Sequence, residues 1–405
     1  MRPATASSYT HTHRTRERHP VQTTSAGALP TGALPKRLAD DLSQALGAAA
    51  GRNSSELTRR TGATWGHKSD PLGHLTGCEP ADERDALLAM LQIHDLWMAP
   101  IETLGGKEAF QTHPAIADLK WRLEGAFVER LREEANHTIP NMTGKRQGRK
   151  SGPRAESPRS ETPQSASGSS ATPSAEDVAG DVIVTIRRIA AHDLVPDVYE
   201  WLADDATWEQ LVRFLTLEGG PDAGFDDLVA LSQVGIRNGP KVVLGANYWD
   251  EMGRGDLNEV HTVLHDRLVA AINMPRPSRD ELPVSALARL AVGGLLATNR
   301  YLQPEAIGAF GLIELQAGPR CRAVVRALTR LDAPEGAFAF YEEHARADPH
   351  HGKAWLDGVI GPLAATQRDW AQRMVDGAVW RQNVNTRFFA EAHQLCSVRA
   401  PVHAE

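Results

Sequence analysis

The amino-acid sequence predicts an all-α fold built around one helical bundle, on three observations. From Val182 to about Cys396, apolar residues recur at spacings of three and four, which is the period of an amphipathic helix. Glycine or proline separates successive segments of this kind, and the strict alternation of a strand is scarce. Hydrophobic residues make up 41% of the 405 residues, which is enough for at least one core.

Four regions follow one another along the chain. Residues 1–80 are rich in Ala, Ser, Thr, Arg and Gly with little periodicity, so we expect them to be disordered. Residues 81–138 contain "DERDALLAMLQIHDLWMAP" and "HPAIADLKWRLEGAFVERLREEANH", which predict two amphipathic helices. In residues 139–180, Pro, Ser, Gly and charged residues replace the large apolar ones, as in a flexible linker. Residues 181–398 form the predicted bundle domain.

Within the bundle region, seven helical segments can be justified in order from their apolar spacing and the turn residues between them. They are "VPDVYEWLADD", "TWEQLVRFLTLEG", "FDDLVALSQVG", "DLNEVHTVLHDRLVAAIN", "PVSALARLAVGGLLATN", "PEAIGAFGLIELQAGPRCRAVVRALTRL" and "GAFAFYEEHARAD". Thr207 followed by Glu209 and Gln210 predicts one helix start, and Asp256 with Glu259 three residues later has the pattern of a capping box.

Composition and charge exclude several classes of protein. The formal net charge of −7 and the pI of about 6.2 give no reason to expect nucleic acid as a partner. The three cysteines contain no CxxC pair, which argues against a disulfide scaffold or a thiolate zinc site and favours the reducing cytoplasm. The first twenty residues lack the apolar stretch of a secretory signal, and no window approaches the roughly 18 apolar residues of a membrane span. We therefore expect a cytoplasmic protein that does not enter a membrane.

The stretch "HARADPHH" contains the first candidate metal ligands. His344, Asp348 and His351 are spaced by four and three, so on one helix they lie within about 40° of one another. Two imidazoles and a carboxylate suit iron or another transition metal better than calcium or magnesium. Two alternatives stay open: the face is simply solvated, or Pro349 restarts the helix after an Asp348 N-cap and turns His351 away.

Two further parts of the sequence add candidate metal ligands. Glu251 and His261 flank a Gly253–Gly255 break, which either joins two ligand-bearing segments or is a plain turn. Glu314 interrupts an apolar helix, and because an unpaired buried carboxylate costs several kcal/mol, it needs a metal, a route to solvent or an arginine partner. Together the six residues are three carboxylates and three imidazoles on separate helical segments, which suits two metal ions in a helical core. A ferritin-like site would need two E-x-x-H pairs, and Glu134 with His137 is the only one in the sequence.

In "DEMGRGDLNEVH", Glu314 and "HARADPHH", the sequence resembles the haem-oxygenase-like diiron oxidases, also described as iron-containing redox enzymes, over roughly residues 182–396. The resemblance implies a haem-oxygenase-like helical bundle. The extra N-terminal helical segment and the disordered linkers that we expect beside it lie outside the matched region. The resemblance also implies one iron held by Glu251, His261 and His351, a second held by His344 and Asp348, and Glu314 bridging or shared. An additional ligand is implied on an earlier helix, for which the candidates are Glu218, Asp222 and Asp226.

For function, the resemblance implies a non-haem diiron enzyme that activates O2 with two Fe ions. Such an enzyme needs an external electron donor or reductase. The ten-residue spacing from Glu to His resembles members that oxygenate amine nitrogen, so we expect an amine or amino-acid-like substrate from a specialised biosynthetic pathway. Oxidative decarboxylation, desaturation or C–C cleavage is the alternative within the fold, and a non-catalytic binding or scaffold protein is the alternative outside it. The 82–138 helices either form a homodimer contact, as extra helices do in some relatives, or pack on the bundle.

Overall fold

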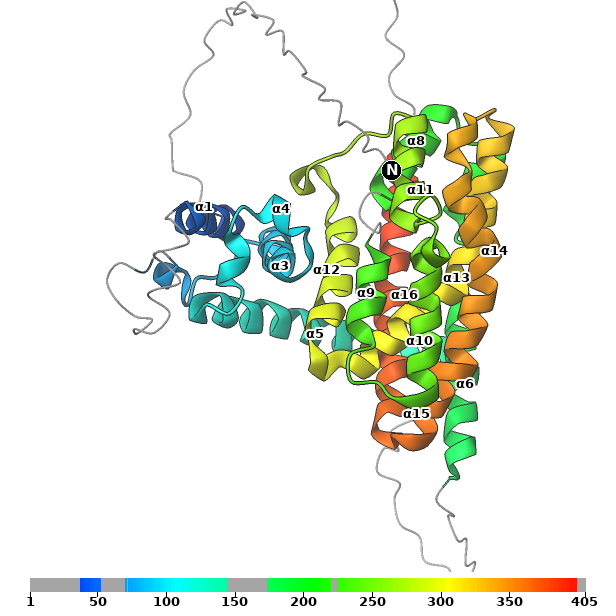
Figure 1. Cartoon of the computed structure of the whole chain (residues 1–405), viewed down its shortest axis with the longest axis horizontal. Helices are drawn as coiled ribbons and strands as arrows, with labels where there is room; N and C mark the ends of the chain where they lie inside the picture. The colour runs from blue at the N-terminus through cyan, green and yellow to red at the C-terminus, as the bar shows by residue number, and fades with distance from the viewer. Residues whose placement is uncertain (1–36, 52–69, 71, 144–172, 220–223, 399–405) are drawn as a thin grey trace, which may run out of the picture. The chain divides into compact units, whose positions relative to one another are not determined.

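The computed structural model describes residues 37–51, 70, 72–143, 173–219 and 224–398. These ranges contain helices and no strand, so the all-α prediction is confirmed for the part of the chain described (Figure 1). All of them belong to one compact unit, Lys36–Glu405. Among the described helices, none is both long and apolar enough to span a bilayer.

The bundle is centred on α13 (Gln303–Arg330), which packs against α14 (Ala339–Ala354) on one side and α16 (Arg368–Ser397) on another. Around these three helices lie the other elements of the bundle: α6 (Ala175–His192), α7 (Asp197–Asp204), α8 (Trp208–Glu218), α9 (Phe225–Ser232), α10 (Asn238–Glu251), α11 (His261–Ala271), α12 (Val284–Thr298), η7 (Trp355–Ile360) and α15 (Gly361–Thr366). Short 3-10 turns, η3 (Gly253–Gly255), η4 (Arg279–Glu281), η5 (Arg300–Leu302) and η6 (Glu335–Ala337), connect them.

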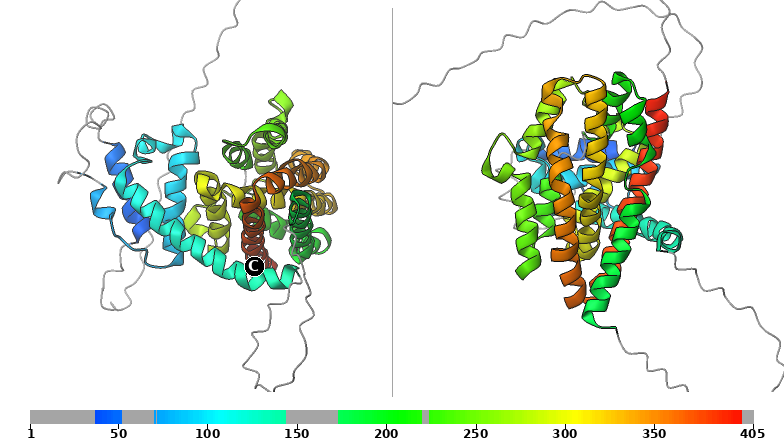
Figure 2. Two further views of the ribbon diagram at one scale, coloured as in Figure 1. Left: turned by 90° about the horizontal axis from the view of Figure 1, so that it is seen from below. Right: turned by 90° about the vertical axis from the view of Figure 1, so that its right-hand side faces the viewer.

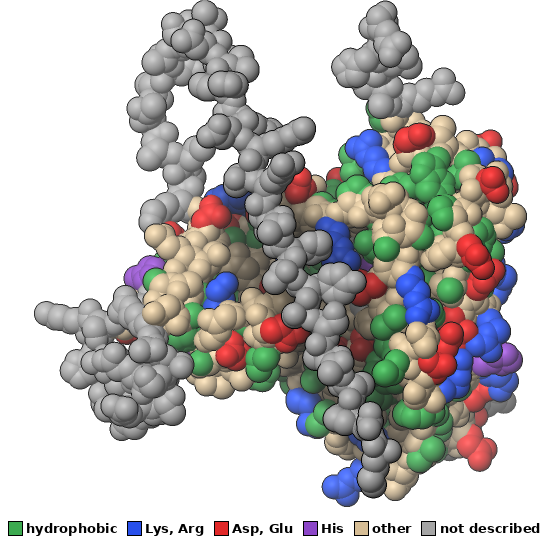
Figure 3. All heavy atoms as spheres, turned by 45° about the horizontal axis from the view of Figure 1, so that its top comes forward, with side chains coloured by type: hydrophobic (Ala, Val, Ile, Leu, Met, Phe, Trp, Pro, Cys, Tyr) green, Lys and Arg blue, Asp and Glu red, His purple; other side chains and the backbone are tan. Residues whose placement is uncertain are grey.

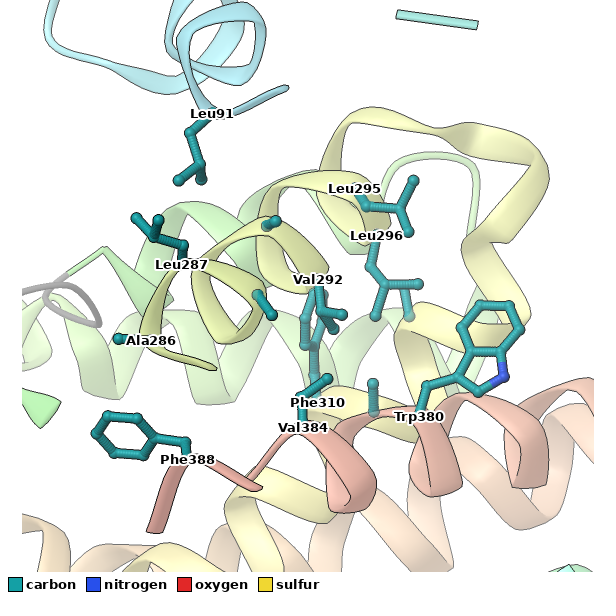
Figure 4. Close-up of a cluster of buried hydrophobic side chains, with 14 of the residues drawn as sticks. Leu91, Ala286, Leu287, Val292, Leu295, Leu296, Phe310, Trp380, Val384 and Phe388 are labelled. Carbon is teal, nitrogen blue, oxygen red and sulfur yellow. The ribbon is translucent and has the colours of Figure 1, made fainter. Parts of the chain in front are cut away.

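Glycines let α13 and α16 cross at backbone contact. A Cβ on Gly308 would lie 1.8 Å from the carbonyl oxygen of Met374, and one on Gly377 would lie 1.9 Å from that of Glu305. Around the crossing, Phe310, Val384 and Trp380 meet the apolar face of α12 in one core (Figure 4). The crossing fixes α13, and with it one wall of the site described below.

The N-terminal segment also packs on the bundle. It consists of α1 (Leu38–Ala50), η1 (Gly73–Leu75), α3 (Glu83–Met98), α4 (Ile101–Leu104), η2 (Lys107–Phe110) and α5 (Pro114–Thr143). The apolar face of α3 contacts α12, and α5 lies across α16 and α6 (Figure 2). The two helices predicted between residues 81 and 138 are therefore present, and α5 continues five residues further.

Several sequence-based boundaries need correction. Disorder is wrong for residues 38–50 and 72–80, because α1 places Leu42 and Leu46 in the core and Leu72 and Leu75 are buried as well. The predicted linker 139–180 is too long at its end, since α6 starts at Ala175 behind a Ser174 capping box. The remaining parts of 1–80 and 139–180 that were predicted to be disordered, 1–36, 52–69, 71 and 144–172, lie outside the described residues.

Of the two predicted helix starts, one is confirmed and the other is wrong. The helix start at Thr207 is confirmed: Thr207 is the N-cap of α8 and forms a capping box with Gln210. The Asp256–Glu259 prediction is wrong: α11 starts at His261, while the Asp256 carboxylate accepts a bond from Asn258 N inside the connecting turn.

On the face drawn in Figure 3, Lys and Arg side chains are interspersed with Asp and Glu over the described residues. A mixed surface of this kind differs from the continuous basic face typical of a nucleic-acid-binding protein.

Candidate metal centre

A tight turn brings the first two predicted ligands together. Glu251 is the last residue of α10 and His261 the first of α11, and η3 reverses the chain between them. Gly253 has φ +61°, and a Cβ there would lie 2.5 Å from the carbonyl carbon of Glu259, so only glycine lets the turn close this tightly. As a result, Glu251 Oε2 lies 2.7 Å from His261 Nδ1.

Helix α14 supplies three more candidate ligands on one face. It runs unbroken from Ala339 to Ala354, so the alternative of a restart at Pro349 is wrong. The proline ring packs over Gly318 of α13, where a Cβ would lie 2.9 Å from Pro349 Cδ. Asp348 and His351 are buried and His344 is half-buried.

Glu314 faces this surface from α13. Its Oε2 lies 3.5 Å from His351 Nδ1, which is 3.7 Å from Asp348 Oδ1. The ring centroids of His261 and His344 are 4.5 Å apart, which joins the α10–α11 turn to the same cluster. The structure thus brings all six sequence-predicted ligands into one buried region.

The arrangement fits metal ions. Glu314 Oε1, Asp348 Oδ2 and His351 Nδ1 are buried without a hydrogen-bond partner, a costly arrangement unless they bind something. Two groups of three have ligand atoms within 4.8 Å of one another, and Glu251 belongs to both. The first group is Glu251, His261 and His344, and the second is Glu251, Glu314 and His351.

These two groups are composed differently from the two ligand sets that the resemblance implied, and that division between two irons stays a prediction. Glu251, rather than Glu314, is common to both groups, and His351 groups with Glu314 instead of with His261. Asp348 belongs to neither group and lies beside the second, next to His351. The membership of the groups reflects distances between helices, which residue spacing does not encode.

The buried carboxylates of the cluster favour a positive charge among them. Burial raises the pKa of Glu314 to about 7, although the nearby His351, whose Nδ1 lies 3.5 Å from Oε2, opposes it. Burial alone would lower the pKa of His351, but the carboxylates of Asp348, Glu314 and Asp250 outweigh it and raise that pKa to about 11. In the metal-free protein the imidazolium of His351 supplies the cation that a metal would otherwise provide.

Hydrogen bonds outside the cluster orient two of the imidazoles. His351 Nε2 lies 2.9 Å from Asp250 Oδ2, which leaves Nδ1 toward Glu314. His344 Nδ1 lies 2.7 Å from the carbonyl oxygen of Phe340, which leaves Nε2 as its ligand atom. Such partners set the tautomer and ring orientation of metal-bound histidines. Sequence reasoning missed Asp250, although its position directly before Glu251 was a signal.

The candidates for an additional ligand are more distant. Glu218, at the end of α8, accepts a hydrogen bond from the Tyr199 hydroxyl and lines the adjoining cavity, outside both ligand groups. Burial, followed by the charge of Asp227, raises the pKa of Asp226, and the charge of Glu251 adds to this. Asp222 lies outside the described residues.

A cavity of about 400 Å³ adjoins the cluster. Glu251, Glu314, His344 and Asp348 line the end at the metal centre. The rest of the wall is largely apolar and comes from α9, α12, α13 and, unexpectedly, α3, with the buried arginines Arg289, Arg320 and Arg381 among its polar residues. A mostly apolar pocket with a few polar groups is typical of a small-molecule site.

The fold and this site define a helical bundle that can hold metal ions beside a small-molecule cavity. Residues 212–385 match the family described as iron-containing redox enzymes, of the haem-oxygenase-like superfamily. The predicted resemblance to this family is therefore confirmed for residues 212–385. All six predicted ligands lie inside the matched segment, while α1 to α5 lie outside it. No curated protein sequence matches the chain.

Proposed function

We propose that this protein is a non-haem diiron oxygenase that uses O2 to oxidise a small molecule, and that the reaction is N-oxygenation of an amine or amino-acid-like substrate. The observation that carries the proposal is the pair of buried ligand groups that share Glu251 at one end of the cavity. Two metal ions bridged by a carboxylate in a helical core are a common arrangement for O2 chemistry.

The residues of the chain have separate tasks in this proposal. Glu251, His261 and His344 hold one iron, and Glu251, Glu314 and His351 hold the other, with Asp348 beside the second. When bound, the two irons would supply the activation of O2, and an external donor would return them to the ferrous state. Asp250 and the Phe340 carbonyl keep their histidines aimed at the metals.

Two observations support a nitrogen-containing substrate. The Glu-to-His spacing across the α10–α11 turn resembles the N-oxygenating members of the family, as noted above. In addition, the carboxylate of Glu218 lines the cavity, where it can accept hydrogen bonds from an amine or complete the ligand set. The largely apolar remainder of the wall excludes water and accommodates the carbon skeleton.

The test is anaerobic loading of the full-length chain with Fe(II), followed by a count of tightly bound iron. We expect about two irons per chain in the wild type. His351→Ala should lose at least one, because His351 Nδ1 faces Glu314 and Asp348. His350→Ala is the matched control, since the neighbouring imidazole is exposed and should leave the count unchanged.

The loaded protein is then mixed with O2 and a panel of primary amines and amino acids, with O2 uptake and hydroxylamine products as readouts. Amine-dependent uptake that is lost in His351→Ala and kept in His350→Ala is the expected result. A folded wild-type protein that binds no iron would overturn the diiron proposal and favour a binding or scaffold role. Iron binding with uptake driven by aliphatic acids instead would move the reaction to decarboxylation or desaturation.

A further inference from the structure

Helix α3 belongs to the segment outside the family match, yet it forms part of the wall of the cavity next to the metal centre. Leu91, His94, Asp95 and Met98 line the cavity from successive turns of one α3 face. Leu91 is 4% exposed, whereas Met98 is half-buried, so the face runs from the interior of the cavity toward its mouth. Figure 4 shows the Leu91 side chain directed from α3 toward Leu287 of α12.

The middle of α3 is fixed to the bundle by a buried imidazole. His94 lies directly against the backbone of α12, where a Cβ on Gly294 would be only 2.2 Å from His94 Nδ1. Its Nε2 lies 2.9 Å from Glu124 Oε1 of α5, and the same oxygen accepts a 3.0 Å bond from Asn299 Nδ2 at the end of α12. Lys120 completes the network with bonds to Glu124 and Asn299.

Two arginines hold α3 at other points. Arg279 of η4 forms a bidentate pair with Asp95 at 2.6 and 2.8 Å, beside the mouth of the cavity. At the start of α3, Arg84 Nη1 donates a 2.8 Å bond to the carbonyl oxygen of Leu282. Planar bidentate pairs of the Arg279–Asp95 kind impose a defined geometry. Attachment at these three places makes α3 a fixed wall of the cavity. The face of α3 that lines the cavity is turned toward the bundle.

The wall is apolar where it faces the interior. Besides Leu91 and Met98, the lining includes Leu228 of α9 and Leu290 of α12, and Gly293 leaves space where a larger residue would project. A carbon skeleton that extends from the metal centre between these helices must end against α3. The number of carbons that fit therefore depends on the side chains that α3 presents.

We propose that α3 determines substrate size, with Leu91 and Met98 setting how long an apolar body the cavity accepts. This inference rests on the proposed function only in placing the substrate in this cavity. The substrate class it defines is a molecule with an oxidisable polar head and an aliphatic or aromatic body, whose far end contacts Leu91. The N-terminal segment is thus part of the active site and is more than a scaffold for the bundle.

The test is anaerobic titration of the full-length Fe(II)-loaded protein with two probe series, straight-chain primary amines and straight-chain primary alcohols of increasing length. In the wild type, each added methylene should tighten binding by about fourfold until the chain reaches α3. Leu91→Ala should move this limit to longer chains, and Leu91→Phe should move it to shorter ones. The control is Leu87→Ala, because Leu87 is equally buried one turn earlier on α3 and does not line the cavity.

A limit that shifts with Leu91 and stays in place with Leu87→Ala supports the proposal. An unchanged limit in both Leu91 variants, an equal shift in the control, or no binding of either series by the wild type would overturn it. The same titrations on metal-free protein separate this inference from the proposed function. Should the chain bind no iron, or show no O2 chemistry, a length limit governed by Leu91 would still stand.

Discussion

The strongest test of how the metal centre is organised is Asp250→Asn. Asp250 belongs to neither ligand group. Its Oδ2 lies 2.9 Å from His351 Nε2, so it would influence metal binding only through that histidine. Asparagine keeps the size of the side chain and can still accept a hydrogen bond, but it removes the negative charge that favours this orientation of the imidazole. Loss of such a partner typically weakens metal binding by about 10- to 100-fold.

The structure places this variant at the lower end of that range. The Asp250 side chain is 30% exposed and also faces Arg254 at 3.4 Å, so solvent and a cation already weaken its hold on His351. We expect about a tenfold loss of affinity, or roughly 1.4 kcal/mol, in the ion bound by Glu314 and His351. The ion bound by His261 and His344 should be unaffected, since the Phe340 carbonyl orients His344 independently.

The assay is anaerobic titration with Co(II), whose visible spectrum reports ligand geometry, in competition with a chelator of known affinity. The wild type should show two binding steps, and Asp250→Asn should weaken one of them with a changed spectrum. Asp357→Asn is the control, because that carboxylate is 43% exposed and pairs with Lys353 away from the cluster. Equal weakening of both steps, or identical titrations for Asp250→Asn and the wild type, would refute the proposed organisation.

Further outcomes follow from the same structure. Fe(II) binding near pH 7 should release protons into a weakly buffered solution, because His351 with a pKa of about 11 is protonated in the metal-free protein and Glu314 with a pKa of about 7 is partly so. Protons compete with the metal, so the apparent affinity should rise from pH 6 to pH 8, and a pH-independent affinity would contradict this charge assignment. Gly377→Ala should lower the free energy of unfolding by about 3 kcal/mol or more in urea melts, since its Cβ would meet a backbone oxygen of α13. Gly180→Ala, in α6 with no atom within 4 Å of its Cβ, should raise it by up to about 1 kcal/mol, and similar effects of the two variants would contradict the close helix crossing.

Residue spacing was sufficient for the part of the site that lies on one helix. His344, Asp348 and His351 share a face of α14 because helical periodicity alone puts them there. Pro349 left the prediction ambiguous, and the ambiguity is resolved by a residue on another helix, the Gly318 against which the proline ring packs. A proline can thus remain inside a helix when its neighbour gives it room.

Spacing was insufficient where the chain turns between helices. The approach of Glu251 to His261 depends on η3, in which the non-glycine residue Arg254 adopts φ +54° between two glycines. Arg254 also contacts Asp250 and Glu343, so its side chain is tied to both α10 and α14. No periodicity rule encodes such a turn, which is why the candidate ligands could be named from the sequence and the distances between them could not.

The N-terminal segment shows a different limit of sequence reasoning. The average composition of residues 1–80 concealed the helical spacing of Leu38, Leu42 and Leu46, which α1 buries. In "AVGGLLAT", two adjacent glycines are unfavourable for a helix considered alone. The structure explains Gly294 through His94, a residue 200 positions earlier that occupies the space a side chain would need. Packing between distant segments therefore decides both the burial of α1 and the need for glycine at position 294. The candidate metal ligands lie inside the family match and the α3 wall lies outside it, so the match bears on the metal centre and not on the α3 side of the cavity.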